Sequence, residues 1–227
     1  MKAAGPSLLE TVRGLLERTY RIETDLDDLG AFVIGDEGYR RFYAGKQLHY
    51  RAASTSGRGA QLLVRELGSE LLVCIYFPDD LIRRLESHPP QRGLDESNID
   101  AFSVFVEEID HFLLLAERAA LGRSLTLFEM ELHANVSKYL VLSRFLAGAG
   151  QVLDPLRRIW LRHHLFEKGR FDDDDAGLRR RYSDARRWGA KFLDALLTRG
   201  APERIDSLRR FHDADAREKL RLMQSAA

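Results

Sequence analysis

The spacing of apolar and polar residues changes twice along this chain, from a helical period to a strand period and back. An amphipathic helix is predicted at about residues 8–20, because Ser7 and Glu10 form a capping box and apolar residues then recur every three or four positions. After Pro78 the helical pattern returns and continues toward the C-terminus. The strands are therefore expected between about residues 30 and 77.

That middle segment is predicted to form a small antiparallel sheet of two hairpins. Each hairpin has a glycine-containing turn between two apolar runs, residues 30–34 and 39–43 around Gly35-Asp36-Glu37-Gly38, and residues 60–67 and 70–77 around Gly68-Ser69. Residues 46–52 are expected to add a strand between the hairpins. The composition of residues 54–59 is typical of a loop.

The rest of the chain predicts a bundle of about five α-helices, preceded by a short helix at 79–87. The long helices are set by capping residues and glycine stops, at about residues 98–121, from the Thr126/Glu129 capping box to 147–150, from Asp154-Pro155 to Gly169, and along an apolar stripe from Leu178 to Leu196. One or two further helices are expected at 203–224.

A sheet followed by a helical bundle is an α+β arrangement. Pro89, Pro90 and Gly93 break the chain between the two patterns and predict a boundary between an α+β subdomain at residues 1–92 and an all-helical subdomain at 93–227. The linker is short, and the helix at 98–121 is apolar on more than one side. We therefore expect the two halves to pack as one body.

The formal charge excludes a global electrostatic preference for nucleic acid or a membrane surface. Lys plus Arg and Asp plus Glu are both 35 in the 227 residues. Residues 151–227 nevertheless hold 18 basic and 13 acidic side chains, which is a net positive charge of five. Any polyanion should therefore prefer the C-terminal third.

Cys74 is the single cysteine, so no intramolecular disulfide can form and a reducing compartment fits best. Its apolar neighbours predict an inert thiol on a buried strand. No apolar run reaches the roughly 18 residues of a membrane span. A cytoplasmic location without membrane association is the expectation.

Acidic and histidine residues recur at helical spacing, which puts both members of a pair on one side of a helix. The pairs are Glu108 with His111, Glu129 with His133, and His163 with Glu167. Together these six residues are the candidate metal ligands, and the first four are also the candidate catalytic residues of a di-iron-like helical enzyme. Bundles of that class use a Glu-x-x-His motif from each of two helices, whereas only the first pair has that spacing.

The alternative for these pairs is structural. A carboxylate among apolar side chains is costly unless a donor reaches it, so acid–base pairs can hold neighbouring helices in register. Glu129 and His133 lie beside apolar residues of their helix and are the better candidates for burial. On this interpretation the chain has no cofactor, no metal and no catalytic residues.

Arginines concentrate on the helix expected after residue 176. The candidate nucleic-acid-binding residues are Arg179, Arg180, Arg181, Arg186, Arg187 and Lys191. Guanidinium groups fork onto phosphates, and Trp188 on the same helix can stack on a base. The four aspartates at 172–175 directly before the run can neutralise it, which argues against this function.

The function predicted from these patterns is that of a non-enzymatic binding or adaptor subunit, which holds a protein partner or a second copy of itself through its helical half. Three observations favour it: no catalytic signature, surplus apolar residues (Val104, Leu114 and Leu115) off the main stripe of helix 98–121, and unequal charge between the two parts. Nucleic-acid binding and di-iron-like catalysis stay as the alternatives.

Overall fold

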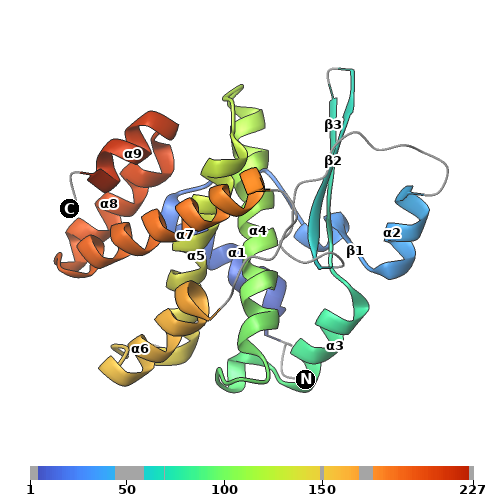
Figure 1. The fold of residues 1–227 in the computed structure, drawn as a ribbon. Helices are drawn as coiled ribbons and strands as arrows, with labels where there is room; N and C mark the ends of the chain where they lie inside the picture. Colours follow the sequence, from blue (N-terminus) through green and yellow to red (C-terminus); the bar gives the residue numbers. More distant parts are fainter. Residues whose placement is uncertain (1–4, 44–58, 69, 149–150, 169–175, 225–227) are drawn as a thin grey trace.

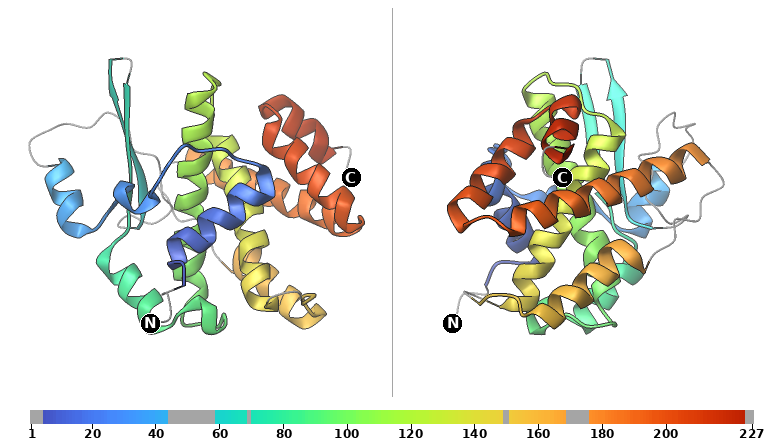
Figure 2. Two further views of the ribbon diagram at one scale, coloured as in Figure 1. Left: turned by 180° about the vertical axis from the view of Figure 1, so that it is seen from behind. Right: turned by 60° about the vertical axis from the view of Figure 1, so that its left-hand side comes forward.

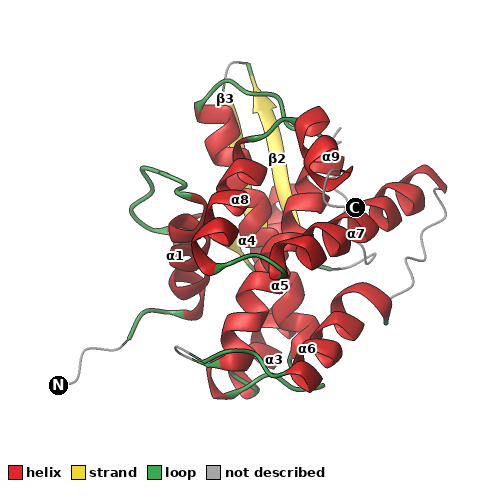
Figure 3. Ribbon diagram, turned by 90° about the vertical axis from the view of Figure 1, so that its left-hand side faces the viewer, coloured by secondary structure: helices red, strands yellow, loops and turns green. Residues whose placement is uncertain are grey.

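A computed structural model describes residues 5–43, 59–68, 70–148, 151–168 and 176–224. Most of the described chain is helical, and its strands form one small sheet (Figures 1 and 3). The elements are α1 (Leu8–Tyr20), a 3₁₀ turn η1 (Leu29–Phe32), β1 (Val33–Ile34), α2 (Asp36–Tyr43), β2 (Gln61–Leu67), β3 (Glu70–Tyr76), α3 (Asp79–Ser87), a 3₁₀ turn η2 (Pro90–Arg92), α4 (Ile99–Ala120), α5 (Leu127–Ala147), α6 (Pro155–Arg162), a π-helical turn η3 (His163–Glu167), α7 (Ala176–Leu197), α8 (Ala201–Asp213) and α9 (Ala216–Gln224).

The helices begin where the capping residues predict. The Ser7 hydroxyl accepts from the Glu10 amide, and both halves of the Thr126/Glu129 capping box are present at α5. Asp154 caps α6, with Pro155 in its first turn. The predicted α+β class is confirmed. The described part of the helical half has six α-helices, because the one or two helices expected at 203–224 are two, α8 and α9.

The sheet has three strands in the order β1-β3-β2. β2 and β3 form the predicted hairpin, with Leu63 opposite Cys74 in an antiparallel register. The first predicted hairpin is wrong. β1 has only two residues and pairs in parallel with β3, so the sheet is mixed. The predicted strand at 46–52 and loop residues 54–58 lie outside the described residues.

The segment predicted as the second strand of that hairpin is the helix α2 instead. Acidic Asp36 opens this helix and basic Arg40 and Arg41 close it, which suits the helix dipole. The Tyr76 hydroxyl of β3 donates to Asp36 at 2.7 Å and anchors the first turn to the sheet. A side chain at Gly38 would meet Ile34 Cβ at 2.8 Å, so the glycine allows a tight reversal into a helix rather than a hairpin turn.

α4 and α5 form the centre of the molecule. The β2–β3 hairpin lies on one side of this pair and α8 with α9 on the other (Figure 1). Seen from behind, α1 crosses α4 and α5 (Figure 2). This packing corrects one expectation: Leu114 is fully buried, and Val104 and Leu115 pack against the core, so the chain itself covers the surplus apolar side of α4.

Contacts connect the two halves of the sequence. The Tyr20 hydroxyl of α1 is 2.8 Å from the Ser137 hydroxyl of α5, and Phe77 after β3 stacks on Phe105 of α4. The subdomain boundary at residue 93 stays a prediction. No helix within the described ranges is both long and apolar enough to cross a membrane.

Candidate functional site

The interface of α4 and α5 buries an acidic and histidine-rich set of side chains in two groups. The first, the carboxylate cluster, consists of Glu107, Glu108 and His111 of α4 with Glu131 and Lys138 of α5. The second, the histidine chain, consists of Asp110, His133, His212 and Glu117. Charged groups are rarely buried unless paired, so each group needs its own account.

The periodicity of α4 explains why these residues lie inside. Its apolar stripe, including Phe102, Ile109 and Leu113, packs into the core. The acidic residues of this helix are covered by α5 and the hairpin, both of which pack against α4. Glu108 faces the hairpin, where it accepts a hydrogen bond from the backbone of Leu62.

The carboxylate cluster is centred on the imidazole of His111. Its Nδ1 lies 3.8 Å from Glu108 Oε2, and its Nε2 lies 4.0 Å from Glu131 Oε1. Lys138 Nζ donates to Glu107 Oε2 at 2.6 Å and ties α5 to α4. From α7, the Tyr182 hydroxyl hydrogen-bonds Glu131. The cluster therefore joins three helices through their polar faces.

Burial and electrostatic attraction between these groups shift their pKa values in opposite directions. Burial raises the pKa of Glu131 to about 8, although His111 opposes the shift. Burial alone would lower the pKa of His111, but Glu108, Glu131 and Glu107 outweigh it and raise that pKa to about 10. For Glu107, burial is outweighed by Lys138, and its pKa falls below the ordinary value. The cluster thus attracts a cation strongly.

The histidine chain runs from α4 through α5 to α8. Asp110 accepts the Nδ1 proton of His133 at 2.8 Å, and His133 Nε2 is 3.0 Å from His212 Nδ1. Because His133 donates from Nδ1, its Nε2 accepts the proton of His212 when the ring is neutral. At the far end, His212 Nε2 lies 2.7 Å from Glu117 Oε2.

The surroundings of this chain keep His133 neutral. Burial lowers the pKa of His133 to about 4, against the attraction of Asp110. The Tyr20 ring packs on the imidazoles of His133 and His212 at 4.5 and 5.1 Å between centroids. Arg118 donates to the backbone carbonyl of His212. These contacts fasten α1, α4, α5 and α8 together.

Ser137 and Cys74 lack the geometry of activated nucleophiles. The Ser137 hydroxyl lies 3.5 Å from Nδ1 of His133, the nitrogen that Asp110 already occupies, whereas a serine triad uses opposite nitrogens. Cys74 lies on β3 and is partly buried, and burial raises the pKa of its thiol to about 11. The predicted inert thiol agrees with this environment.

The predicted site residues separate in space. Glu108 and His111 lie together, but the Glu129 carboxylate accepts hydrogen bonds from the N–H and hydroxyl of Thr126 and approaches Lys219 at 4.0 Å, while His133 belongs to the histidine chain. The predicted burial of Glu129 and His133 is confirmed. His163 and Glu167 are exposed on η3 and pair with each other at 3.3 Å. The six residues therefore do not form one metal site.

Sequence reasoning missed the residues that complete each group. Glu107 lies one turn before His111, and Glu131 lies two turns before Lys138, so both pairs follow helical spacing. This spacing is visible in the sequence. Asp110 reaches His133 only across the α4–α5 interface, 23 positions along the chain, and no local spacing predicts such a contact.

The candidate nucleic-acid residues spread around α7. Arg179, Arg180 and Lys191 are exposed, and Arg187 pairs with Asp184 at 3.2 Å. Arg186 is half-buried, and burial lowers its pKa despite the attraction of Glu107. Arg187 and Lys191 both lie over the Trp188 ring, at 5.4 and 5.0 Å from its centroid. The ring that was expected to stack on a base already has two cationic neighbours.

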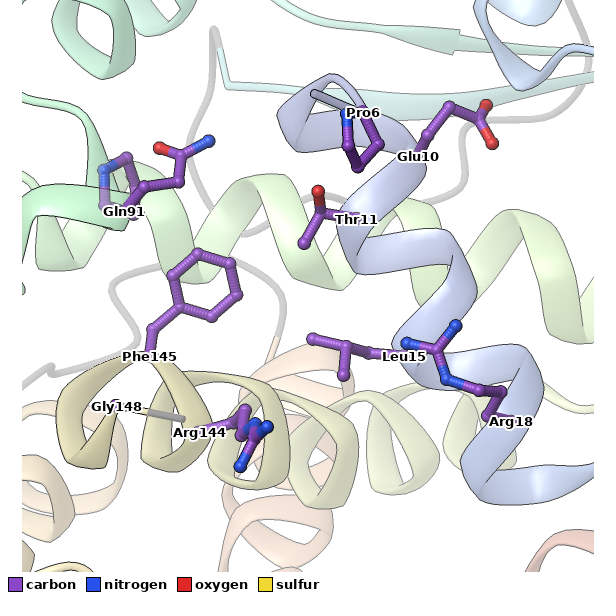
Figure 4. Close-up of a pocket in the computed structure, with 10 residues that line it drawn as sticks. Pro6, Glu10, Thr11, Leu15, Arg18, Gln91, Arg144, Phe145 and Gly148 are labelled. Carbon is purple, nitrogen blue, oxygen red and sulfur yellow. The ribbon is translucent and has the colours of Figure 1, made fainter. Parts of the chain in front are cut away.

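A surface groove of about 600 Å³ lies between α1 and the end of α5 (Figure 4). Phe145 and Leu15 line it, and the exposed side chains of Arg18 and Arg144 lie beside them. Glu10, also in its lining, pairs with Arg13. A specific ligand site uses buried polar groups that converge on the ligand. The polar groups of this groove are exposed or paired along α1.

Comparisons with known proteins add no assignment. The chain matches no protein-family model, no curated protein and no solved structure at a significant level.

Proposed function

We propose that this protein is a non-enzymatic binding subunit that holds an acidic amphipathic helix of a partner protein against α6. One observation carries the proposal. Val152, Leu156 and Ile159 form an apolar stripe with 87, 78 and 65% of their surface exposed. Contiguous exposed apolar residues mark interaction sites more often than single ones do.

The stripe is a feature of α6 rather than a poorly packed piece of core. Leu156 and Ile159 are three apart on α6 and lie on one side of the helix, and Val152 lies in the segment just before the helix begins at Pro155. The opposite side carries Leu161, which is fully buried. α6 lies at the edge of the molecule (Figure 1), which leaves the stripe accessible to a partner.

Shape and charge favour a helix of acidic character as the occupant. Apolar residues at helical spacing are recognised by a second amphipathic helix with matching spacing. Of the four Lys or Arg in residues 151–168, Arg157, Arg162 and Lys168 pair with Asp154, Asp194 and Glu96. Arg158 has no ion pair within 4.0 Å among the described residues, and it is the group that favours a partner with acidic flanks. A second copy of α6 would bring arginine-rich segments together and is disfavoured.

The two buried groups support a binding role over catalysis. Glu107, His111, Glu131 and His133 are each at least nine-tenths buried. A general acid or base must come within hydrogen-bond reach of its substrate. Substrate contact with these atoms would require α4 and α5 to separate.

The test uses two fluorescent helical peptides with the same apolar face, one with glutamates and one with lysines on the polar face. We expect the wild-type protein to bind the acidic peptide more tightly, as measured by fluorescence anisotropy. Replacing the two stripe residues on α6 (Leu156→Ser with Ile159→Ser) should weaken binding by about tenfold or more, because each contributes an anchor.

A matched control is Leu121→Ser, which changes an exposed apolar residue at the end of α4 (56% exposed). It should leave peptide binding unchanged. Equal affinity for both peptides, or insensitivity to the double replacement, contradicts the proposal. A dimer in light scattering that the double variant abolishes identifies a second copy as the occupant. Salt-dependent retention on DNA or RNA without peptide binding favours the nucleic-acid alternative.

A further inference from the structure

We propose that the carboxylate cluster binds one divalent first-row transition-metal ion, with Glu107 and His111 of α4 and Glu131 of α5 as its ligands. The ion is structural and fastens α4 to α5. This site is distinct from the α6 stripe, and it stands or falls independently of the docking function.

The geometry brings three ligand types to one point inside the protein. One ligand atom from each of Glu107, His111 and Glu131 lies within 4.8 Å of the other two. All three side chains are buried, with 7, 4 and 5% exposure. Metal–ligand distances in such sites are about 2.0–2.2 Å. The 4.0 Å between His111 Nε2 and Glu131 Oε1 therefore leaves room for an ion between them.

An unpartnered nitrogen points into this space. His111 Nε2 is buried and has no hydrogen-bond partner among the described residues. An orphaned polar atom in the interior costs roughly 1–3 kcal/mol, and native proteins rarely leave one unsatisfied. A metal ion at that position satisfies the nitrogen and both carboxylates together.

The neighbouring groups hold the ligands in the orientation that an ion needs. The Nδ1 atom of His111 faces Glu108 at 3.8 Å, so a carboxylate lies behind the imidazole and leaves Nε2 for the ion. Lys138 holds Glu107 through Oε2, and Tyr182 holds Glu131. Outer partners of this kind commonly fix metal ligands.

The competing occupant is a proton on His111, which would make an ion pair with Glu108 and Glu131. The distances of 3.8 and 4.0 Å are too long for direct hydrogen bonds. Glu107 already has Lys138 as its partner, whereas Glu131 and Nε2 of His111 face each other across 4.0 Å without a hydrogen bond between them. A divalent ion fills this gap, which a proton leaves open.

The chemistry of the three ligands indicates which ion the site binds. One imidazole nitrogen with two carboxylates suits Zn²⁺, Mn²⁺ or Fe²⁺, whereas Mg²⁺ and Ca²⁺ prefer oxygen ligands alone. Three protein ligands leave a fourth position for a water molecule. Because all three side chains are buried, substrate cannot reach the ion unless the helices separate, and the ion is therefore structural.

The first test uses wild-type full-length protein purified with Zn²⁺ or Mn²⁺ in the medium. Plasma mass spectrometry should find about one ion per chain. Extraction with a chelator during partial unfolding should lower the thermal midpoint by about 5 °C or more, and refolding with Zn²⁺ or Mn²⁺ should restore it. Absence of stoichiometric metal together with a chelator-insensitive midpoint overturns the proposal.

Variants then locate the ion. Glu131→Gln keeps the shape of the side chain and removes a buried charge, so the protein should still fold while metal affinity falls by about tenfold or more. Glu167→Gln is the control, because Glu167 also pairs with a histidine but lies on the surface. Metal retained in Glu131→Gln, or lost equally in the control, overturns the assignment. If Glu131→Gln does not fold, His111→Gln serves for the same comparison, and the wild-type measurement alone still decides whether an ion is bound.

Discussion

At the scale of single residues, the cost of burying charge is clearest at Lys219. Its side chain on α9 is fully buried, and Nζ has no hydrogen-bond partner in the described part of the chain. The nearest charge is Glu129 Oε1 at 4.0 Å, and the Phe211 ring lies at 5.5 Å. Burial, together with repulsion from Arg118, lowers the pKa of Lys219 to about 8 despite attraction by Glu129, Asp110 and Asp213.

Lys219→Met should therefore stabilise the protein at neutral pH by about 1–2 kcal/mol, because methionine fills similar space without a charge. The unfolded chain binds the lysine proton more tightly than the folded protein does, so the wild type gains stability between pH 8 and 10.5. The advantage of the variant should be full below pH 8 and shrink as the pH approaches 10. Urea unfolding at several pH values measures it.

The control is Lys191→Met, which removes a lysine from an exposed position of α7. It should change the unfolding free energy little at any of these pH values. A variant at position 219 that is less stable than wild type at pH 7 would show that the lysine makes a net favourable contact.

At the scale of elements, the crossing of α5 and α7 depends on Gly189. A side chain at this position would meet Asn135 Cβ at 3.2 Å and Leu132 Cδ1 at 3.9 Å. The glycine lets the two helices approach closely enough for Tyr182 to reach Glu131. Close packing of this kind tolerates little added volume.

Gly189→Val should destabilise the protein by about 1–3 kcal/mol, because the branched side chain forces the helices apart. Chemical denaturation measures the loss. Lys191→Val places the same residue on an exposed turn of the same helix and should cost much less. Equal effects of the two changes would attribute the loss to helix propensity rather than to packing.

Local chemistry explains which elements were predictable. The starts of α1, α5 and α6 follow from side chains that cap their own helix within three residues. α2 was missed because Gly35 and Gly38 are compatible with a turn, and the contact that favours the helix comes from Tyr76, 40 positions away. A pattern read within one segment contains no information about that partner.

At the scale of the whole molecule, α1 packs against the core formed by the later helices α5 and α8. Its Tyr20 contacts Ser137, His133 and His212, which belong to α5 and α8. Two ends of the sequence therefore depend on each other. The single 3-stranded sheet packs on α4 from the other side.

We expect the chain to unfold in one cooperative transition for this reason. Far-ultraviolet circular dichroism and the fluorescence of Trp160 and Trp188 should give the same urea midpoint. A fragment starting at residue 93 lacks α1 and the hairpin, and it should lose its near-ultraviolet signal. Two separated transitions, or a fragment with native-like side-chain packing, would show that the halves fold independently.

The candidate site was predictable only in part at this scale. Helical spacing identified Glu108 with His111, and burial of Glu129 and His133 was expected from their apolar neighbours. The grouping of the six candidates into one site depended on how α4, α5 and η3 pack. In the packed structure, Glu131 lies beside His111, and His133 pairs with Asp110.

The sequence by itself determined where α1, α5 and α6 begin, the β2–β3 hairpin and the α+β class, because capping, turn chemistry and periodicity act over a few residues. The tertiary structure decided that residues 36–43 are helical and which carboxylate meets which imidazole. It also decided which apolar surface is left uncovered, α6 rather than α4. Such contacts join residues tens of positions apart, and only the packed chain brings those residues together.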